Sequence, residues 1–411
     1  MIFKLENVGK IKRAEVELHG ITVVAGNNRT GKSTVGKMLY CIFSAFKNES
    51  VFQERANIFE DILSDLFFHK LKIRTYMTPK KIFYDISEEN LEQKIEELVS
   101  YGINNKIDFP EILKKELYEE IIKLLKTKDD TLQRSIFDRY LQVEFSGNVN
   151  HINNPEKTAE VYAKMKDEEI KLEIKNNACS KTNKLTNVYS DVFYIDTSFA
   201  LDDLNNFAMK KNREYEHRYK LTKKLTKTNL DTNIINEIEA KEKIAKIFST
   251  IESMPEEIKE GDFIPENGRL LYREKKHPTA LDFNSVSAGM KPFLTIKRLL
   301  ESAEIKNKSV IVLDEPEVNL HPEWQLFFAE FIVLLQKEYD ATILLATHSP
   351  YFLEAIETYG KKHNIEDKCR YYLARNEDDI YSVIEDVTQE TNKIYDLFAN
   401  PFRKLSSMAA L

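Results

Sequence analysis

Short and almost uniformly apolar runs are spaced along the chain, and a polar or glycine-containing loop follows each of them. The clearest runs are residues 20–25 (GITVVA), 192–196 (VFYID), 309–314 (SVIVLD) and 341–346 (ATILLA). Runs of this length that are rich in Val and Ile are typical of strands buried on both faces of a sheet. Stretches with apolar residues at helical spacing lie between them, so the pattern predicts an α/β fold.

Two intervals between these runs have a mainly helical pattern. Residues 47–140 carry periodic apolar positions in several stretches, and Pro110 is placed to open one of the predicted helices. Residues 198–258 form a second and shorter helical insertion. Only about 60 residues are available there, which favours a short hairpin-like pair of helices over a long arm.

Polar and apolar residues alternate in several other segments, and this alternation predicts further strands. Strands at 141–145, 159–165 and 168–175 are expected to be antiparallel, and a hairpin is expected within 262–283.

Two more strands are predicted after the last buried run, at 370–375 (RYYLAR) and 379–387 (DIYSVIEDV), and we expect both to lie at an edge of the sheet. A helix is predicted from about residue 389, with Ile394, Leu397 and Phe398 on its apolar face.

Composition narrows the class of protein. The 411 residues are sufficient for a large buried core. The 60 basic and 67 acidic side chains give a net charge of −7, whereas a protein that coats nucleic acid would be strongly basic. No run approaches the roughly 20 apolar residues of a membrane span. The start MIFKLENVGK lacks the apolar core of a signal peptide, and the three cysteines are widely spaced. We therefore expect a cytoplasmic protein with no membrane partner.

A glycine-containing loop lies between the run at 20–25 and the helical pattern that follows it. The loop matches G-x-x-x-x-G-K-[ST], and strand, loop and helix occur in the order that a phosphate-binding P-loop requires. Glycines allow successive N–H groups to face one anion, and the helix N-terminus adds partial positive charge. The pattern predicts that the nucleotide is bound by Gly26, Asn27, Asn28, Arg29, Thr30, Gly31, Lys32, Ser33 and Thr34.

Particular side chains of this site have predicted roles. Lys32 can reach the β and γ phosphates, and the Ser33 hydroxyl can ligate Mg²⁺. The run at 309–314 ends in Asp314 and Glu315, which places two carboxylates at the edge of the sheet where ligands bind. Asp314 is predicted to hold Mg²⁺, and Glu315 to orient or deprotonate the attacking water. A strand followed by an ordinary acidic turn is the alternative for this second motif taken alone.

Three further segments resemble motifs of the ABC ATPases in the SMC and OLD (overcoming lysogenisation defect) group. Residues 315–322 (EPEVNLHP) resemble the end of the Walker B motif and the D-loop, and residues 347–350 (THSP) resemble the switch-histidine motif. Residues 285–291 (SVSAGMK) resemble the signature, whose consensus is Leu-Ser-Gly-Gly-Gln. Ser287 and Gly289 keep the consensus, whereas Ala288 replaces its first glycine.

The resemblance implies a fold and a way of working. It implies an ABC-type P-loop ATPase head with a mixed central sheet, an antiparallel β subdomain and two mainly helical insertions. The cofactors would be ATP and Mg²⁺. Catalysis would use Glu315, His348 and Lys32. Each nucleotide-binding site would be completed across a homodimer, or within a larger oligomer, by the partner's copies of Ser287, Ala288 and Gly289. Asn319 would belong to the D-loop. A structural role for His348 is the simpler alternative, and no residue could be assigned as the Q-loop glutamine.

The implied domain organisation interleaves the head with its insertions. The head would comprise residues 1–46, which hold the P-loop, the β part at 141–197, and residues 259–411, which hold the signature, Walker B, D-loop and switch histidine. The insertions would be 47–140 and 198–258.

One part of the second insertion is basic in a chain that is net acidic. Between residues 210 and 227, eight Lys or Arg residues stand against two Glu, with Tyr215 and Tyr219 among them. This composition predicts a nucleic-acid contact through Lys220, Lys223 and Lys224. A solvated helix or a dock for an acidic partner is the alternative.

The resemblance extends to biology. The chain is similar to the stand-alone ATPase subunits of bacterial antiphage defence systems such as Septu and PARIS, which act with a separately encoded effector, often a nuclease. The 36 residues after Arg375 are too few for the Toprim nuclease domain of OLD proteins, and no metal-nuclease cluster is evident among the eight histidines. The predicted function is therefore an ATP-driven sensor or switch. The alternatives are a DNA-repair or chromosome-maintenance ATPase, a transporter subunit and a stand-alone toxin.

Overall fold

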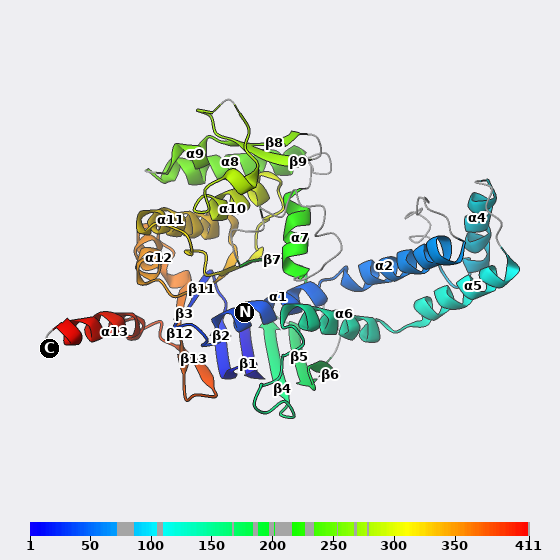
Figure 1. Ribbon diagram of the computed structural model, residues 1–411, viewed down its shortest axis with the longest axis horizontal. Helices are drawn as coiled ribbons and strands as arrows, with labels where there is room; N and C mark the ends of the chain where they lie inside the picture. The colour runs from blue at the N-terminus through cyan, green and yellow to red at the C-terminus, as the bar shows by residue number, and fades with distance from the viewer. Residues whose placement is uncertain are drawn as a thin grey trace. The chain divides into compact units, whose positions relative to one another are not determined.

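The structure is a computed structural model in which the chain divides into two compact units (Figure 1). Unit 1 comprises Met1–Ser44 and Asp138–Leu411, and unit 2 comprises Ala45–Phe137. The residues that the structure describes are 1–71, 86–104, 110–166, 168–183, 188–196, 201, 216–226, 234–252, 254–266, 269–277 and 279–409.

Unit 1 is built on an eleven-stranded mixed sheet in the order β6-β5-β4-β1-β2-β13-β12-β3-β11-β10-β7. Its strands are β1 (Ile2–Val8), β2 (Ile11–Glu17), β3 (Ile21–Gly26), β4 (Ala159–Met165), β5 (Glu168–Lys175), β6 (Ala178–Thr182), β7 (Val192–Ile195), β10 (Val310–Asp314), β11 (Thr342–Thr347), β12 (Cys369–Asn376) and β13 (Ser382–Asp386).

The sheet has a parallel part and an antiparallel part. Strands β12, β3, β11, β10 and β7 all run parallel, and β3 and β10 are buried along their whole length, as their continuous apolar sequences predict. Strands β2, β1, β4, β5 and β6 pair in an antiparallel manner. The predicted α/β class with a mixed sheet is confirmed, as are the antiparallel strands at 159–165 and 168–175.

The prediction that the last two strands lie at an edge is wrong. Strands β12 and β13 occupy the interior of the sheet, where β12 pairs with β3 and β13 pairs with β2. The charges that flank them are typical of edge strands, but position in a sheet is decided by distant partners. Tyr372 illustrates this, because it is buried and its hydroxyl accepts a hydrogen bond from the Glu17 N–H at 2.8 Å.

The prediction of a strand at 141–145 is also wrong, because residues 141–144 form the last turn of helix α6 (Asp129–Glu144). Tyr140, Leu141 and Glu144 are all buried. Positions i, i+1 and i+4 share one face of a helix but alternate between the two faces of a strand, so burial on one side selects the helix.

Helices cover the parallel part of the sheet. Among them, α11 (Pro322–Tyr339) lies beside α12 (Pro350–Lys362) (Figure 1). The others in unit 1 are α1 (Lys32–Ala45), α7 (Glu216–Leu225), α8 (Ile234–Thr250), α9 (Glu256–Lys259), α10 (Lys291–Glu301) and α13 (Asn392–Ala409). Strands β8 (Asp262–Glu266) and β9 (Arg269–Arg273) form the predicted hairpin.

The insertion at 198–258 does not form a projecting hairpin in its described residues. Helix α7 packs on β7 and α10, and α8 packs on α10 and α11. Leu221, Leu225 and Ile247 are buried in the main hydrophobic core. The apolar faces of both helices are therefore satisfied by the body of unit 1 rather than by each other.

Unit 2 has a hydrophobic core of its own. It contains α2 (Ser50–Ser64), the π-helical turn η1 (Asp65–Lys70), α4 (Leu91–Asn104) and α5 (Glu111–Lys126), and Pro110 precedes α5 as predicted. The core is formed mainly by Phe59, Leu63, Leu91, Ile95, Leu117 and Ile121. Arg55 joins α2 to the end of α5 through the carbonyls of Leu124 and Thr127. The sequence predicts a helical insertion at 47–140, and unit 2 comprises Ala45–Phe137.

We predict that Phe331→Ala lowers the free energy of unfolding of unit 1 by about 3–5 kcal/mol, because truncating a buried aromatic residue leaves a cavity. Phe331 is fully buried on α11, with its ring 6.0 Å from that of Phe293. Guanidinium unfolding can be followed by the fluorescence of Trp324, the single tryptophan, whose ring is also 6.0 Å from Phe293. The control Phe402→Ala removes a ring of a residue that is 66% exposed. It should change the free energy of unfolding by about 0.5 kcal/mol at most. Equal losses in the two variants would contradict the prediction.

Candidate nucleotide site

The loop after β3 has the backbone of a P-loop. Arg29 and Gly31 have positive φ angles of 64° and 88°, and helix α1 begins at Lys32. A Cβ atom at Gly31 would lie 2.7 Å from the Ile11 side chain, and one at Gly26 would lie 2.1 Å from the Ala374 carbonyl oxygen. Both glycines are therefore required by close packing, and Gly31 also by its positive φ angle.

Lys32 is held inside this loop. Its ammonium donates hydrogen bonds to the carbonyl oxygens of Gly26 and Asn27, each at 3.0 Å, and lies 3.7 Å from Glu315 Oε1. Burial lowers the pKa of the Lys32 ammonium, and the Glu315 carboxylate opposes that effect. The lysine is thus positioned at the mouth of the loop, with acceptors that a phosphate oxygen can replace.

Asp314 lies opposite Ser33 and has both of its carboxylate oxygens engaged. Ser33 Oγ donates to Oδ1 at 3.0 Å, and Tyr194 Oη donates to Oδ2 at 2.7 Å. Burial raises the pKa of the Asp314 carboxyl, and the hydrogen bonds from Tyr194 and Ser33 oppose the rise. The structure therefore brings the two predicted metal ligands into contact.

The chemistry of this pair fits Mg²⁺. The ion prefers oxygen ligands and is commonly held by one or two protein groups together with substrate phosphates. Among the described residues, no group of three or more His, Cys, Asp or Glu side chains is placed to hold a metal alone. Ser33 and Asp314 would hold Mg²⁺ jointly with a nucleotide.

Glu315 and His348 face each other across the ends of β10 and β11. His348 Nδ1 lies 3.5 Å from Glu315 Oε1, and Glu315 has a positive φ angle of 51°, an uncommon conformation for a residue with a side chain. Contact with His348 lowers the pKa of Glu315, and contact with Glu315 raises the pKa of His348. The two predicted catalytic groups therefore form a partly exposed pair beside Lys32.

Glu317 is a site residue whose contacts the sequence did not reveal. Its buried Oε1 accepts hydrogen bonds from the Thr347 hydroxyl and from the His348 N–H, the latter at 3.0 Å. Burial raises the pKa of its carboxyl, and the hydrogen bond from Thr347 opposes the rise. The acid thus fastens the switch-histidine loop to the segment after β10. In the sequence, the only signal is a second acid two positions after Glu315.

The signature and the D-loop meet within one chain. Ser287 and Ala288 are exposed just before helix α10, and a Cβ atom at Gly289 would lie 3.4 Å from the Asn319 carbonyl oxygen. Asn319 has a positive φ angle of 71°. The exposed position at a helix N-terminus leaves Ser287 accessible to a second molecule.

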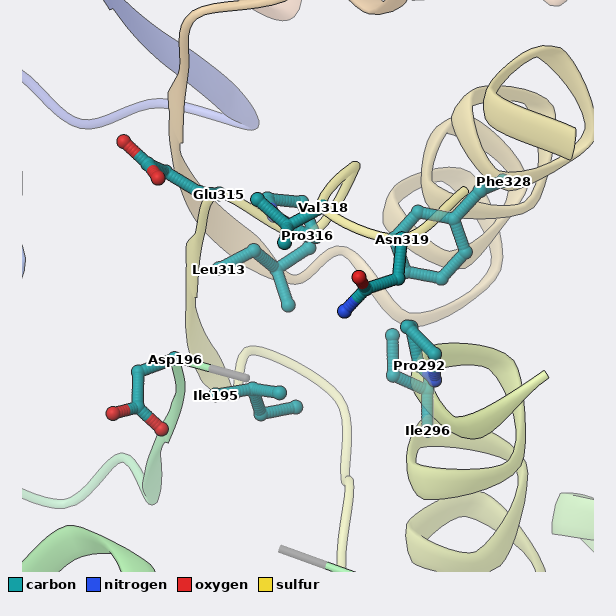
Figure 2. A pocket seen from close by; sticks show the side chains of 10 residues that line it. All are labelled: Ile195, Asp196, Pro292, Ile296, Leu313, Glu315, Pro316, Val318, Asn319 and Phe328. Carbon is teal, nitrogen blue, oxygen red and sulfur yellow. The ribbon is translucent and has the colours of Figure 1, made fainter. Parts of the chain in front are cut away.

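A small cavity lies under the segment that follows β10. Its volume is about 150 Å³, and its walls come from the ends of β7 and β10 and from α10 and α11 (Figure 2). In Figure 2 the Asn319 amide points toward Pro292 and Ile296, whereas the Glu315 carboxylate extends away from them. Ligand pockets are commonly 300–1,000 Å³, so the cavity is too small for a molecule the size of ATP.

In the described part of the basic stretch, residues 216–226, most of the basic side chains contact other groups of the protein. Lys220 bonds the Tyr140 hydroxyl, and Lys224 pairs with Glu304 at 3.0 Å. Lys223 is exposed. Lys210, Lys211, Arg213, Tyr215 and Lys227 lie outside the described residues. The nucleic-acid contact through Lys220, Lys223 and Lys224 stays a prediction, with two of its three lysines engaged in intramolecular contacts.

Comparison with known proteins gives one family match. A family model described as "AAA domain, putative AbiEii toxin, Type IV TA system" matches residues 21–354, which include the P-loop, Asp314, Glu315 and His348. No curated protein matches the chain. Among the residues that the structure describes, no helix has the length and apolar character needed to cross a membrane.

Solved structures similar to the chain include SMC heads. The SMC head domain from Thermotoga maritima has a TM-score of 0.39 and 11% identity, covering 94% of this chain and 98% of that one. The Smc head with an extended coiled coil bound to the C-terminal domain of ScpA, derived from Pyrococcus furiosus, has a TM-score of 0.42 and 10% identity, covering 96% and 98%.

We predict that His348 titrates above the ordinary histidine pKa in the nucleotide-free protein and that Glu315→Gln lowers its pKa, because contact with Glu315 is the main cause of the rise. NMR of the labelled imidazole measures this directly. A group whose pKa is higher in the folded chain stabilises that chain below its unfolded pKa of about 6.5, and this contribution is lost as the pH rises through the folded value. An unchanged His348 pKa in Glu315→Gln would contradict the pairing.

Proposed function

The chain belongs to the AAA family with this description, and we propose that it binds and hydrolyses Mg-ATP at a site completed between two copies of the chain. The contact between Ser33 and Asp314 at 3.0 Å, with Lys32 and Glu315 beside it, is the observation that carries the proposal. It combines a phosphate-binding loop, a metal-binding pair and a candidate base at one edge of the sheet.

Binding would exchange partners within the site. The Lys32 ammonium would leave the carbonyls of Gly26 and Asn27 for the β and γ phosphates, while the N–H groups of the loop and of the α1 N-terminus surround the phosphates. Ser33 and Asp314 would hold Mg²⁺, which when bound neutralises charge on the phosphate oxygens.

Hydrolysis would depend on Glu315. Its lowered pKa keeps the carboxylate ionised near neutral pH, so it can orient a water molecule and accept its proton. His348, held by Glu317 through the backbone, would donate to the γ-phosphate. The positive φ of Glu315 directs its side chain out of the strand, and such a conformation is often retained at functional sites.

Closure of two heads would follow from differential binding. ATP held by Lys32 of one copy and by Ser287 of the other would stabilise the closed dimer, because the open form offers only half of these contacts. Hydrolysis would remove the shared γ-phosphate and release the heads.

Glu315→Gln is expected to keep ATP affinity, lower turnover by at least about 100-fold and accumulate dimer, because the variant keeps the side-chain shape but loses the base. Lys32→Ala is expected to lose nucleotide affinity. Steady-state hydrolysis, fluorescent-nucleotide titration and light scattering measure the three quantities. Undiminished turnover in Glu315→Gln would remove this residue from the mechanism.

A mixing experiment tests whether the site is shared. Lys32→Ala and Ser287→Arg homodimers should both be inactive, whereas their heterodimer contains one site with an intact Lys32 and an intact Ser287. Co-expression with two different affinity tags isolates that heterodimer, and it should recover about half of the wild-type turnover when each site acts independently. A heterodimer as inactive as both parents would argue against composite sites.

We further propose that the ATPase is the sensor or switch of a bacterial antiphage defence complex and acts with a separate effector. The resemblance of its motifs to the stand-alone ATPase subunits of defence systems supports this proposal, and the family description names a putative toxin of a type IV TA system. The described residues show no metal cluster that could serve a nuclease.

Co-purification of Glu315→Gln from its own host with ATP and Mg²⁺ tests this role. A stoichiometric small protein with nuclease chemistry, identified by mass spectrometry and absent from a Lys32→Ala preparation, is the expected result. Recovery of the chain alone, with hydrolysis stimulated by DNA, would favour a DNA-repair ATPase instead.

A further inference from the structure

A buried network connects the metal-binding aspartate to helix α7. We propose that Tyr194 and His217 are positioning residues that hold Asp314 in the orientation needed to bind Mg²⁺. This inference rests on the proposed Mg-ATP site, and it assigns a role to two residues that no motif contains.

Tyr194 contacts the metal-binding carboxylate directly. It lies in β7, which is parallel to β10, and its register partner is Val312, two residues before Asp314. Its ring is 1% exposed, and its hydroxyl donates to Asp314 Oδ2 at 2.7 Å. With Oδ2 held by this bond, Oδ1 is turned toward Ser33, the other proposed metal ligand.

His217 holds Tyr194 from the other side. The two ring centroids are 4.6 Å apart, at an edge-on angle of 64°. His217 Nδ1 lies 2.6 Å from Glu144 Oε2, and its Nε2 lies 3.3 Å from Asp196 Oδ2. The short contact of Nδ1 with Glu144 holds the imidazole in place, and Asp196 lies within ion-pair distance of Nε2.

The charges around His217 are balanced locally. Glu144 and Asp196 face it from α6 and from the end of β7, and Arg218 forms a bidentate pair with Asp196. Burial alone would lower the pKa of His217, but contacts with Asp196 and Glu144 raise it. Glu144, Asp196, Arg218 and His217 thus form a cluster beside Tyr194, which keeps the α7 N-terminus attached to the edge of the sheet.

The opposite end of α7 is attached to the signature helix. Arg298 of α10 donates from Nε to the Leu225 carbonyl oxygen at 3.0 Å, and Lys224 pairs with Glu304 just beyond α10. One short helix therefore contacts both the strand that positions Asp314 and the helix that follows Ser287.

Metal affinity of the nucleotide complex tests the role of Tyr194 without relying on turnover. In the Glu315→Gln background, the fluorescent analogue mant-ATP is titrated in EDTA and then across a range of Mg²⁺ concentrations. Tyr194→Phe removes only the hydroxyl and should weaken the apparent Mg²⁺ affinity about 10-fold, as loss of an outer-shell partner commonly does. Affinity for mant-ATP in EDTA should not change.

Matched variants separate the possible results. Tyr189→Phe makes the same chemical change at a tyrosine that is 77% exposed and should leave the Mg²⁺ dependence unaltered. His217→Gln should weaken Mg²⁺ affinity, and adding it to Tyr194→Phe should cause no further loss, because both act through one hydroxyl. Losses that multiply in the double variant would overturn the assignment of His217.

Failure of this inference can be distinguished from failure of the proposed function. An unchanged Mg²⁺ dependence in Tyr194→Phe would overturn the role of Tyr194 while the parent still binds Mg-mant-ATP. A Glu315→Gln parent that binds mant-ATP no better with Mg²⁺ than with EDTA would overturn the proposed function itself.

Discussion

The common direction of β3, β11 and β10 is the constraint on which the candidate site depends. Because the strands are parallel and in register, with Ala346 opposite both Val24 and Asp314, the residues that follow them emerge at one edge of the sheet. Lys32, Glu315 and His348 belong to three distant segments and meet there without any loop having to reach across the molecule. Both faces of these strands are buried, so a change of register would break the packing of every side chain along them.

The charged groups at that edge form exchangeable pairs. Lys32 contacts two carbonyl oxygens and Glu315, while His348 lies between Glu315 and Glu317. Each pair is favourable by itself, and a bound triphosphate would offer the Lys32 ammonium a partner of higher negative charge. A site organised in this way stays folded before its ligand arrives and loses little free energy on rearrangement. Glu317 differs from the others because it is buried and accepts hydrogen bonds from the Thr347 hydroxyl and the His348 N–H. It therefore holds the backbone of the loop in place while the charged side chains rearrange.

The parts of the site that could be predicted are those encoded by local strings. The P-loop and the run ending in Asp314 and Glu315 each combine a strand with its functional residues within about ten positions, so periodicity and residue type together identify them. Tyr194 and His217 carry no such pattern, because their decisive contacts join residues 120 and 73 positions apart. The same reason explains the errors in the predicted fold. The composition of β12 and β13 describes their local polarity, but only pairing with β2 and β3 shows that they are interior. Residues 141–144 contain too few positions to distinguish a strand from the last turn of a helix.

The central position of β12 and β13 has a consequence for how the chain acquires its structure. The strand that bears the P-loop is flanked by β11 and β12, and the Ser382 hydroxyl bonds the Lys10 carbonyl across 372 positions. During synthesis, β2 and β3 must therefore wait for strands made at the far end of the sequence. Contacts of such long range fold slowly, and until they form the unpaired strand edges of the nascent chain are open to intermolecular pairing. We infer that a ribosome-bound intermediate stopped before residue 369 cannot close the sheet, and that chaperones shielding β2 and β3 would raise the yield of folded protein.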